Sequence, residues 1–143
     1  MILGNDQKGD IAQRLDYMEI QLGDLRKFDK LDWKSYQTDR DAQRNVERLI
    51  ENVANATIDI AKIVLVGEDV EMPGSYRDIV LKLGLIGILS ESEAEKIAEY
   101  AKLRNILAHQ YLDIKWEKIT HFIKNAGSDY QNFIQKISQR IKA

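Results

Sequence analysis

The sequence has 143 residues, of which 44% are hydrophobic and 31% charged, and its formal net charge at pH 7 is −2. This length suits one domain spanning residues 1–143, and the composition is too apolar for a disordered chain. The slightly acidic balance excludes a general binder of polyanions, so any contact with nucleic acid requires a local basic patch.

Helix-breaking residues are scarce, with one proline and eight glycines, and apolar residues recur at helical spacing. The spacing predicts a first helix over 10–28 and a longer second helix that begins at 35 or 38 and reaches 66. The end of the second helix is apolar nearly all round, so we expect it to be buried on two sides, by this domain or by a partner chain. The apolar residues outside its main stripe are Ile58, Ile63, Leu65 and Val66.

Capping patterns mark the later helices. Ser75 with Asp78 resembles a capping box and predicts a short helix to about 83, and Ser90 with Glu93 predicts a helix to about 108. Asp113 is the predicted cap of a last long helix. The sequence therefore predicts an all-α, up-and-down antiparallel bundle of four or five helices with mostly short connections.

No membrane segment is predicted. The N-terminus lacks a charged region followed by an apolar one, and the longest apolar run, 61–67, contains Lys62 and is far shorter than the roughly 18 residues of a membrane span. The absence of cysteine excludes disulfides and thiolate metal sites. We expect a cytoplasmic protein without membrane contact.

The segment 104–111, Arg-Asn-Ile-Leu-Ala-His-Gln-Tyr, is the candidate for chemistry. It is predicted to lie at a helix end, where side chains need not face the core. A histidine such as His109 exchanges protons, and the planar fork of Arg104 matches phosphate oxygens. These two kinds of side chain suffice for metal-free cleavage of RNA. In that reaction the 2′-hydroxyl attacks the adjacent phosphorus, a base and an acid move protons, and a cation stabilises the phosphorane.

The spacing of these two residues raises a geometric problem. Five residues place Arg104 and His109 about 140° apart on an ideal helix. They converge only if the helix ends between them or if a symmetric partner supplies a second copy. A twofold homodimer also supplies the second imidazole that acid–base chemistry needs, and the apolar end of the second helix is a candidate part of its interface. From spacing alone, the competing interpretation is a helix-terminal histidine beside a solvated arginine.

Other residues have both a functional and a structural interpretation. Arg40 and Arg44, one turn apart near the start of the second helix, are candidate contacts for RNA phosphates, and the alternative is a solvated face with acidic partners. Aromatic side chains are able to stack on bases, but they more often pack. Packing or surface roles are expected for Tyr100, His121, Trp33 and Trp116.

The segment 104–111 resembles the signature of the HepT-like HEPN toxins, which is Arg, four residues, His, any residue, Tyr. The resemblance extends over about 39–123. Residues 39–45 are similar to the opening of the family's second helix, 73–77 to its central turn, and 83–86 to the link that follows. Lys102 and Leu103 depart from the pair that many members have there.

This resemblance implies a dimerising bundle that acts as a metal-independent endoribonuclease, with no cofactor. It would be the toxin of a type VII HEPN/MNT toxin–antitoxin system, and its substrate would be RNA, either tRNA or mRNA. Arg104 and His109 would be the ribonuclease residues, assisted by Asn105. Tyr111 would receive AMP from an MntA-like nucleotidyltransferase antitoxin, adding bulk and negative charge beside the site. The alternative is a non-catalytic nucleotide-binding or interaction module that associates with a nucleotidyltransferase.

Overall fold

The computed structural model describes residues 3–109 and 111–142, and every regular element in these two ranges is helical. In chain order the elements are α1 (Asn5–Leu25), the 3₁₀ turn η1 (Arg26–Phe28), α2 (Trp33–Thr38), α3 (Arg40–Gly67), α4 (Tyr76–Leu85), α5 (Glu91–His109) and α6 (Leu112–Lys142). The predicted all-α class is confirmed. The predicted count of four or five helices missed α2, and none of the described helices is long and apolar enough to cross a membrane.

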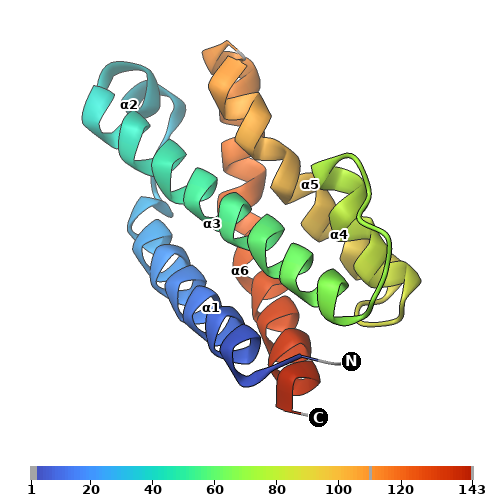
Figure 1. Cartoon of the computed structure of the whole chain (residues 1–143). Helices are drawn as coiled ribbons and strands as arrows, with labels where there is room; N and C mark the ends of the chain where they lie inside the picture. Colours follow the sequence, from blue (N-terminus) through green and yellow to red (C-terminus); the bar gives the residue numbers. More distant parts are fainter. Residues whose placement is uncertain (1–2, 110, 143) are drawn as a thin grey trace.

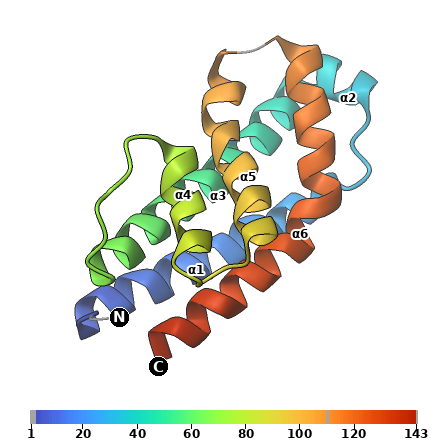
Figure 2. The same ribbon diagram turned by 90° about the vertical axis from the view of Figure 1, so that its right-hand side faces the viewer.

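Helix α3 occupies the centre of the bundle and contacts α1, α2, α4, α5 and α6. Helix α1 runs antiparallel to α3 (Figure 1), and α5 runs antiparallel to both α4 and α6 (Figure 2). The connection over 68–75 runs back along the bundle before α4 begins. As a result α4 follows the same general direction as α3, which departs from a strict up-and-down order.

Side-chain caps set the starts of α2 and α3, whereas the N-cap residue of α1, Gly4, makes no side-chain cap bond. Helix α1 begins at Asn5, earlier than the predicted start at 10. The Asp32 carboxylate accepts a hydrogen bond from the Ser35 N–H at 2.8 Å and starts α2. Asp39 has an extended backbone and accepts from the Ala42 N–H at 3.1 Å, so a second cap separates α2 from α3. The predicted start of the long helix at 35 or 38 was therefore wrong.

The caps predicted for the later helices are mostly present. The Asp78 N–H donates to Ser75 Oγ at 3.1 Å at the start of α4. Ser90 and Glu93 form the reciprocal box, with bonds of 2.7 and 3.1 Å, at the start of α5. Asp113 is instead the second residue of α6, and its carboxylate accepts from the following backbone N–H at 2.9 Å. Local capping thus sets most of the helix starts.

A single hydrophobic core takes side chains from all six of the α-helices described above. It includes the apolar end of α3, because α4 and α5 pack against that helix. Ile58 and Leu65, which were candidates for a dimer interface, are 4% and 0% exposed, so the chain buries them itself. Of the two alternatives left open for the end of α3, burial by the same domain therefore holds for these two residues. Val66, at 59%, is exposed.

Candidate active site

The segment predicted to carry the chemistry lies at one end of the bundle. Arg104, Asn105 and His109 belong to α5, which ends at His109, and Tyr111 directly precedes α6. The C-terminal end of α5 and the start of α6 meet there, on the side of the bundle where α2 lies (Figure 2). This placement leaves Asn105, His109 and Tyr111 exposed to solvent.

A polar and aromatic cluster fixes the start of α6 next to this segment. The Lys115 ammonium lies 3.1 Å from Glu47 of α3, and the Tyr36 hydroxyl donates to the same carboxylate at 2.8 Å. The burial of Tyr36 and this bond raise the pKa of its phenol far above the usual value. Trp33 and Trp116 pack against the Tyr36 ring with centroid distances of 6.2 and 5.1 Å. The two tryptophans therefore have the packing role that was expected for them.

Arg104 is held by the start of α4. Its guanidinium donates to the Tyr76 hydroxyl at 3.3 Å, and its Cζ lies 5.3 Å from the centre of the Tyr76 ring. Within the described residues Arg104 has no carboxylate partner, whereas Arg77 nearby lies 3.7 Å from Glu99. The charge of Arg104 is thus positioned but not neutralised, as a phosphate-binding residue requires.

Sequence reasoning missed Tyr76 as part of this site. Tyr76 was noticed only as a member of the segment 73–77. Nothing in the local pattern pairs it with Arg104, which is 28 positions later in the chain. The contact depends on the return of the connection 68–75 along the bundle, which places the start of α4 beside the middle of α5.

His109 and Arg104 do not share a face of α5. The helix continues without interruption from Arg104 through His109, so a spacing of five keeps them about 140° apart. The guanidinium turns toward α4, and the exposed His109 side chain makes no hydrogen bond or ion pair with the rest of the described chain. Of the two arrangements that would bring them together, a helix end between them is absent. A single chain therefore does not bring the two side chains together.

Arg40 and Arg44 lie on the first turns of α3, and both side chains are exposed. The acidic partners considered for them are not present among the described residues, since neither arginine is ion-paired there. They lie toward the same end of the bundle as the segment 104–111, because Glu47, about one turn after Arg44, bonds Lys115 on the first turn of α6. Their charges are accordingly available to a large anionic ligand at this end.

Tyr100 and His121 have the structural roles that were expected. Tyr100 is 3% exposed, and its hydroxyl donates to Asp129 at 2.5 Å. Burial, followed by this bond, raises the pKa of the Tyr100 phenol. His121 is exposed on α6, with a ring nitrogen 3.1 Å from the Asn125 amide. The second histidine of the chain therefore provides a natural control for His109.

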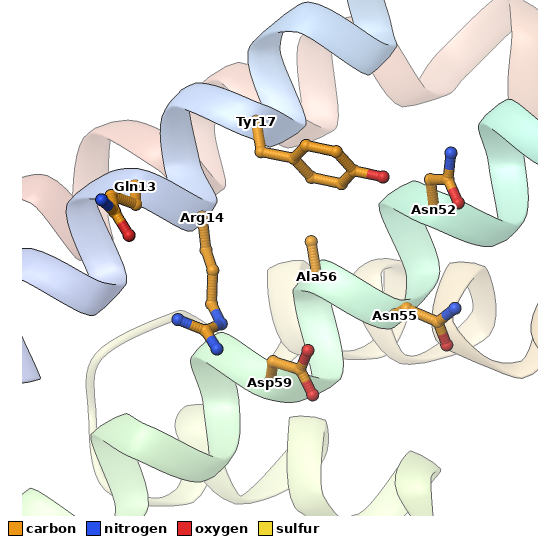
Figure 3. Close-up of a pocket in the computed structure, with 7 residues that line it drawn as sticks. All are labelled: Gln13, Arg14, Tyr17, Asn52, Asn55, Ala56 and Asp59. Atoms are coloured by element: carbon orange, nitrogen blue, oxygen red, sulfur yellow. The ribbon is translucent and has the colours of Figure 1, made fainter.

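A groove lined by other residues lies between the first and third helices. About 430 Å³ opens between α1 and α3, where Figure 3 shows Tyr17 and Asn52 at one end and Arg14 and Asp59 at the other. None of the predicted site residues lines it, and it holds no histidine. Among the described residues there is also no group of three or more histidine and carboxylate side chains arranged to hold a metal ion.

The sequence matches one family model and two named relatives. A family model described as "Ribonuclease HepT-like" matches residues 18–137. A protein named tRNA nuclease HepT, from Aphanizomenon flos-aquae (strain 2012/KM1/D3), is 29% identical over 130 residues, which cover 90% of this chain and 87% of that protein. A protein named mRNA nuclease HepT, from Shewanella oneidensis (strain MR-1), is 24% identical over 106 residues, which cover 74% and 80%.

Among solved structures, the fold is similar to that of a tri-AMPylated HEPN toxin from Shewanella oneidensis, solved in complex with an MNT antitoxin. The TM-score is 0.81 at 20% identity, and the match covers 95% of this chain and 99% of the other. At this identity the likeness supports the fold alone.

Proposed function

This chain belongs to the HepT-like ribonuclease family, and from that premise we propose that it is the endoribonuclease toxin of a HEPN/MNT toxin–antitoxin pair. The observation that carries the proposal is the placement of Arg104, His109 and Tyr111 at one exposed end of the bundle, with the arginine free of any carboxylate among the described residues. RNA is the proposed substrate, and the cytoplasm the proposed site of action.

The proposed reaction needs no metal. The ribose 2′-oxygen attacks the adjacent phosphorus, one imidazole takes the 2′-proton, and a second protonates the leaving 5′-oxygen. The products are a 2′,3′-cyclic phosphate and a free 5′-hydroxyl. Arg104 stabilises the charge on the phosphorane, and Asn105, exposed on the adjacent position of α5, assists as a hydrogen-bond donor.

A homodimer completes this site. One chain offers His109 once and directs Arg104 toward α4, about 140° away around the helix. A twofold axis beside the end of α5 would bring two imidazoles and two guanidinium groups to one groove. The proposal of a dimer fails if light scattering at micromolar concentration gives the mass of one chain.

Tyr111 is the proposed site of control. Its side chain is 82% exposed, so a nucleotidyltransferase antitoxin has access to the hydroxyl. Transfer of AMP forms a bond from the phenolic oxygen to the α-phosphorus of ATP and releases pyrophosphate. The added phosphate lies two residues from His109, where it blocks and repels an RNA phosphate. Incubation with such an enzyme and ATP is expected to modify the wild type and to leave Tyr111→Phe unmodified, as read by mass spectrometry.

The test of the proposal is cleavage of tRNA and mRNA transcripts in EDTA. Wild type and the control His121→Ala are expected to cleave, because His121 lies on α6, where its ring nitrogen is 3.1 Å from the Asn125 amide. His109→Ala and Arg104→Ala are expected to lose at least about 100-fold in rate. No cleavage by the wild type, together with tight binding to a nucleotidyltransferase, would instead support a non-catalytic nucleotide-binding or interaction module.

A further inference from the structure

Two cations converge on Tyr76 at the start of α4. The Lys62 ammonium, from α3, lies 5.4 Å from the centre of the ring, and the Arg104 Cζ lies 5.3 Å from it. All three side chains are only partly exposed. Like charges that share one ring repel each other, so such an arrangement ordinarily includes a carboxylate.

Neither cation has a carboxylate partner among residues 3–109 and 111–142. Two other cations nearby do have a carboxylate partner, since Lys102 and Arg77 each lie 3.7 Å from Glu99 and share it. The surface around Tyr76 therefore carries two positive charges whose counter-charge is missing from the described chain. A pair of phosphates on one strand is the ligand that this charge pattern complements.

We propose that Lys62, Tyr76 and Arg104 form one phosphate-binding unit for the RNA strand. In this unit Arg104 binds the scissile phosphate, Tyr76 is a positioning residue that orients the guanidinium through its hydroxyl and ring, and Lys62 binds a neighbouring phosphate. The inference rests on the proposed ribonuclease function and deepens it.

The unit also sets the course of the strand. Arg104 lies five residues before the end of α5, about 7.5 Å along the axis from His109. Lys62 lies on the adjacent helix α3, and Tyr76 between the two at the first turn of α4. From the scissile phosphate at Arg104, the bound RNA runs past Tyr76 to the neighbouring phosphate at Lys62 on α3.

Binding to single-stranded RNA at several KCl concentrations tests the role of Lys62, with His109→Ala in every protein to prevent cleavage. The logarithm of the RNA-binding constant falls linearly with the logarithm of the salt concentration. For single-stranded RNA, each lost phosphate contact makes this slope shallower by about 0.7. For Lys62→Gln we expect a salt dependence that is shallower by about this amount, and for Lys62→Arg the same salt dependence as that of the parent protein. Lys102→Gln removes the same charge from a lysine that already has a carboxylate partner, Glu99, and is expected to leave the slope unchanged. Equal loss from Lys62→Gln and Lys102→Gln, or no loss from either, would overturn the proposal.

Single-turnover cleavage tests the role of Tyr76, in chains that retain His109. Tyr76→Phe keeps the ring but removes the hydroxyl that Arg104 bonds, so we expect a rate about 3- to 10-fold lower with unchanged RNA affinity and salt slope. Tyr76→Leu, which removes the ring as well, is expected to be slower still. A Phe variant as fast as wild type would remove Tyr76 from the unit. If the wild type itself does not cleave, the proposed function fails, whereas the salt slopes still decide whether Lys62 binds phosphate.

Discussion

The carboxylate of Glu93 joins the start of α5 to α6, and its neutralisation provides a quantitative test of the packing. It accepts from the Lys136 ammonium at 2.6 Å, from the Ser90 backbone N–H at 2.7 Å, and from the Asn132 amide. The bond from Lys136, followed by that from Ser90, lowers the pKa of Glu93 from 4.5 to about 2. A depressed pKa stabilises the fold above pH 4.5, and this contribution is lost as the pH falls toward 2.

The size of the effect follows from the shift. One pKa unit corresponds to about 1.4 kcal/mol, which sets an upper limit of about 3 kcal/mol for this group. The Glu93 side chain is 25% exposed, so solvent screening reduces the expected value to about 1–2 kcal/mol. Glu93→Gln is therefore expected to lower the free energy of unfolding by about 1–2 kcal/mol at pH 7, and to flatten its decline between pH 5 and pH 2.

Urea denaturation followed by circular dichroism, repeated across pH 2–7, measures both quantities. The matched control is Glu95→Gln, because Glu95 is an exposed carboxylate on the same helix without an ion pair in the described chain. A Glu93→Gln variant as stable as the Glu95→Gln control at pH 7, with the same pH dependence as wild type, would refute this reasoning.

Further predictions concern the close packing of the helices, and each is measured by urea denaturation. A Cβ added at Gly84 of α4 would lie 2.8 Å from the Ala94 Cβ of α5, so Gly84→Ala is expected to cost about 1–3 kcal/mol. Gly127 of α6 has open space around it, and Gly127→Ala is expected to gain about 0.5–1 kcal/mol; a loss there would contradict the open packing. Tyr130 and Thr57 share a buried hydrogen bond of 2.8 Å, and Thr57 also donates to the carbonyl one turn earlier. Thr57→Val leaves the buried Tyr130 hydroxyl without its hydrogen-bond partner. It is expected to lower the free energy of unfolding by about 1–3 kcal/mol, against about 1 kcal/mol for Tyr130→Phe. A larger loss of stability for Tyr130→Phe than for Thr57→Val would contradict this assignment of the hydrogen bonds.

Local signals in the sequence predicted the parts of the fold that local chemistry decides. The boxes at Ser75 and Ser90 predicted two helix starts, because the capping bonds join residues three apart. Helix α2 was missed because six residues are too few to show an apolar period. The segment 104–111 was also placed correctly at a helix end, because that placement depends on local signals in the sequence.

Contacts between distant parts of the chain were not predictable in this way. The apolar end of α3 was compatible with a partner chain or with the same domain, and only the packing of α4 and α5 decides between them. The bond between Tyr76 and Arg104 likewise depends on the path of the connection 68–75. Periodicity shows that a face is buried, but it does not identify which element covers it.

Subunit mixing tests most directly whether two chains share one catalytic site. Wild type and His109→Ala, carrying different tags, are unfolded together at equal concentration, refolded, and assayed for RNA cleavage in EDTA. If each dimer needs both imidazoles, only dimers of two wild-type chains cleave, and about one quarter of the activity per dimer remains. Activity of one half, as expected for chains that cleave independently, would contradict the account.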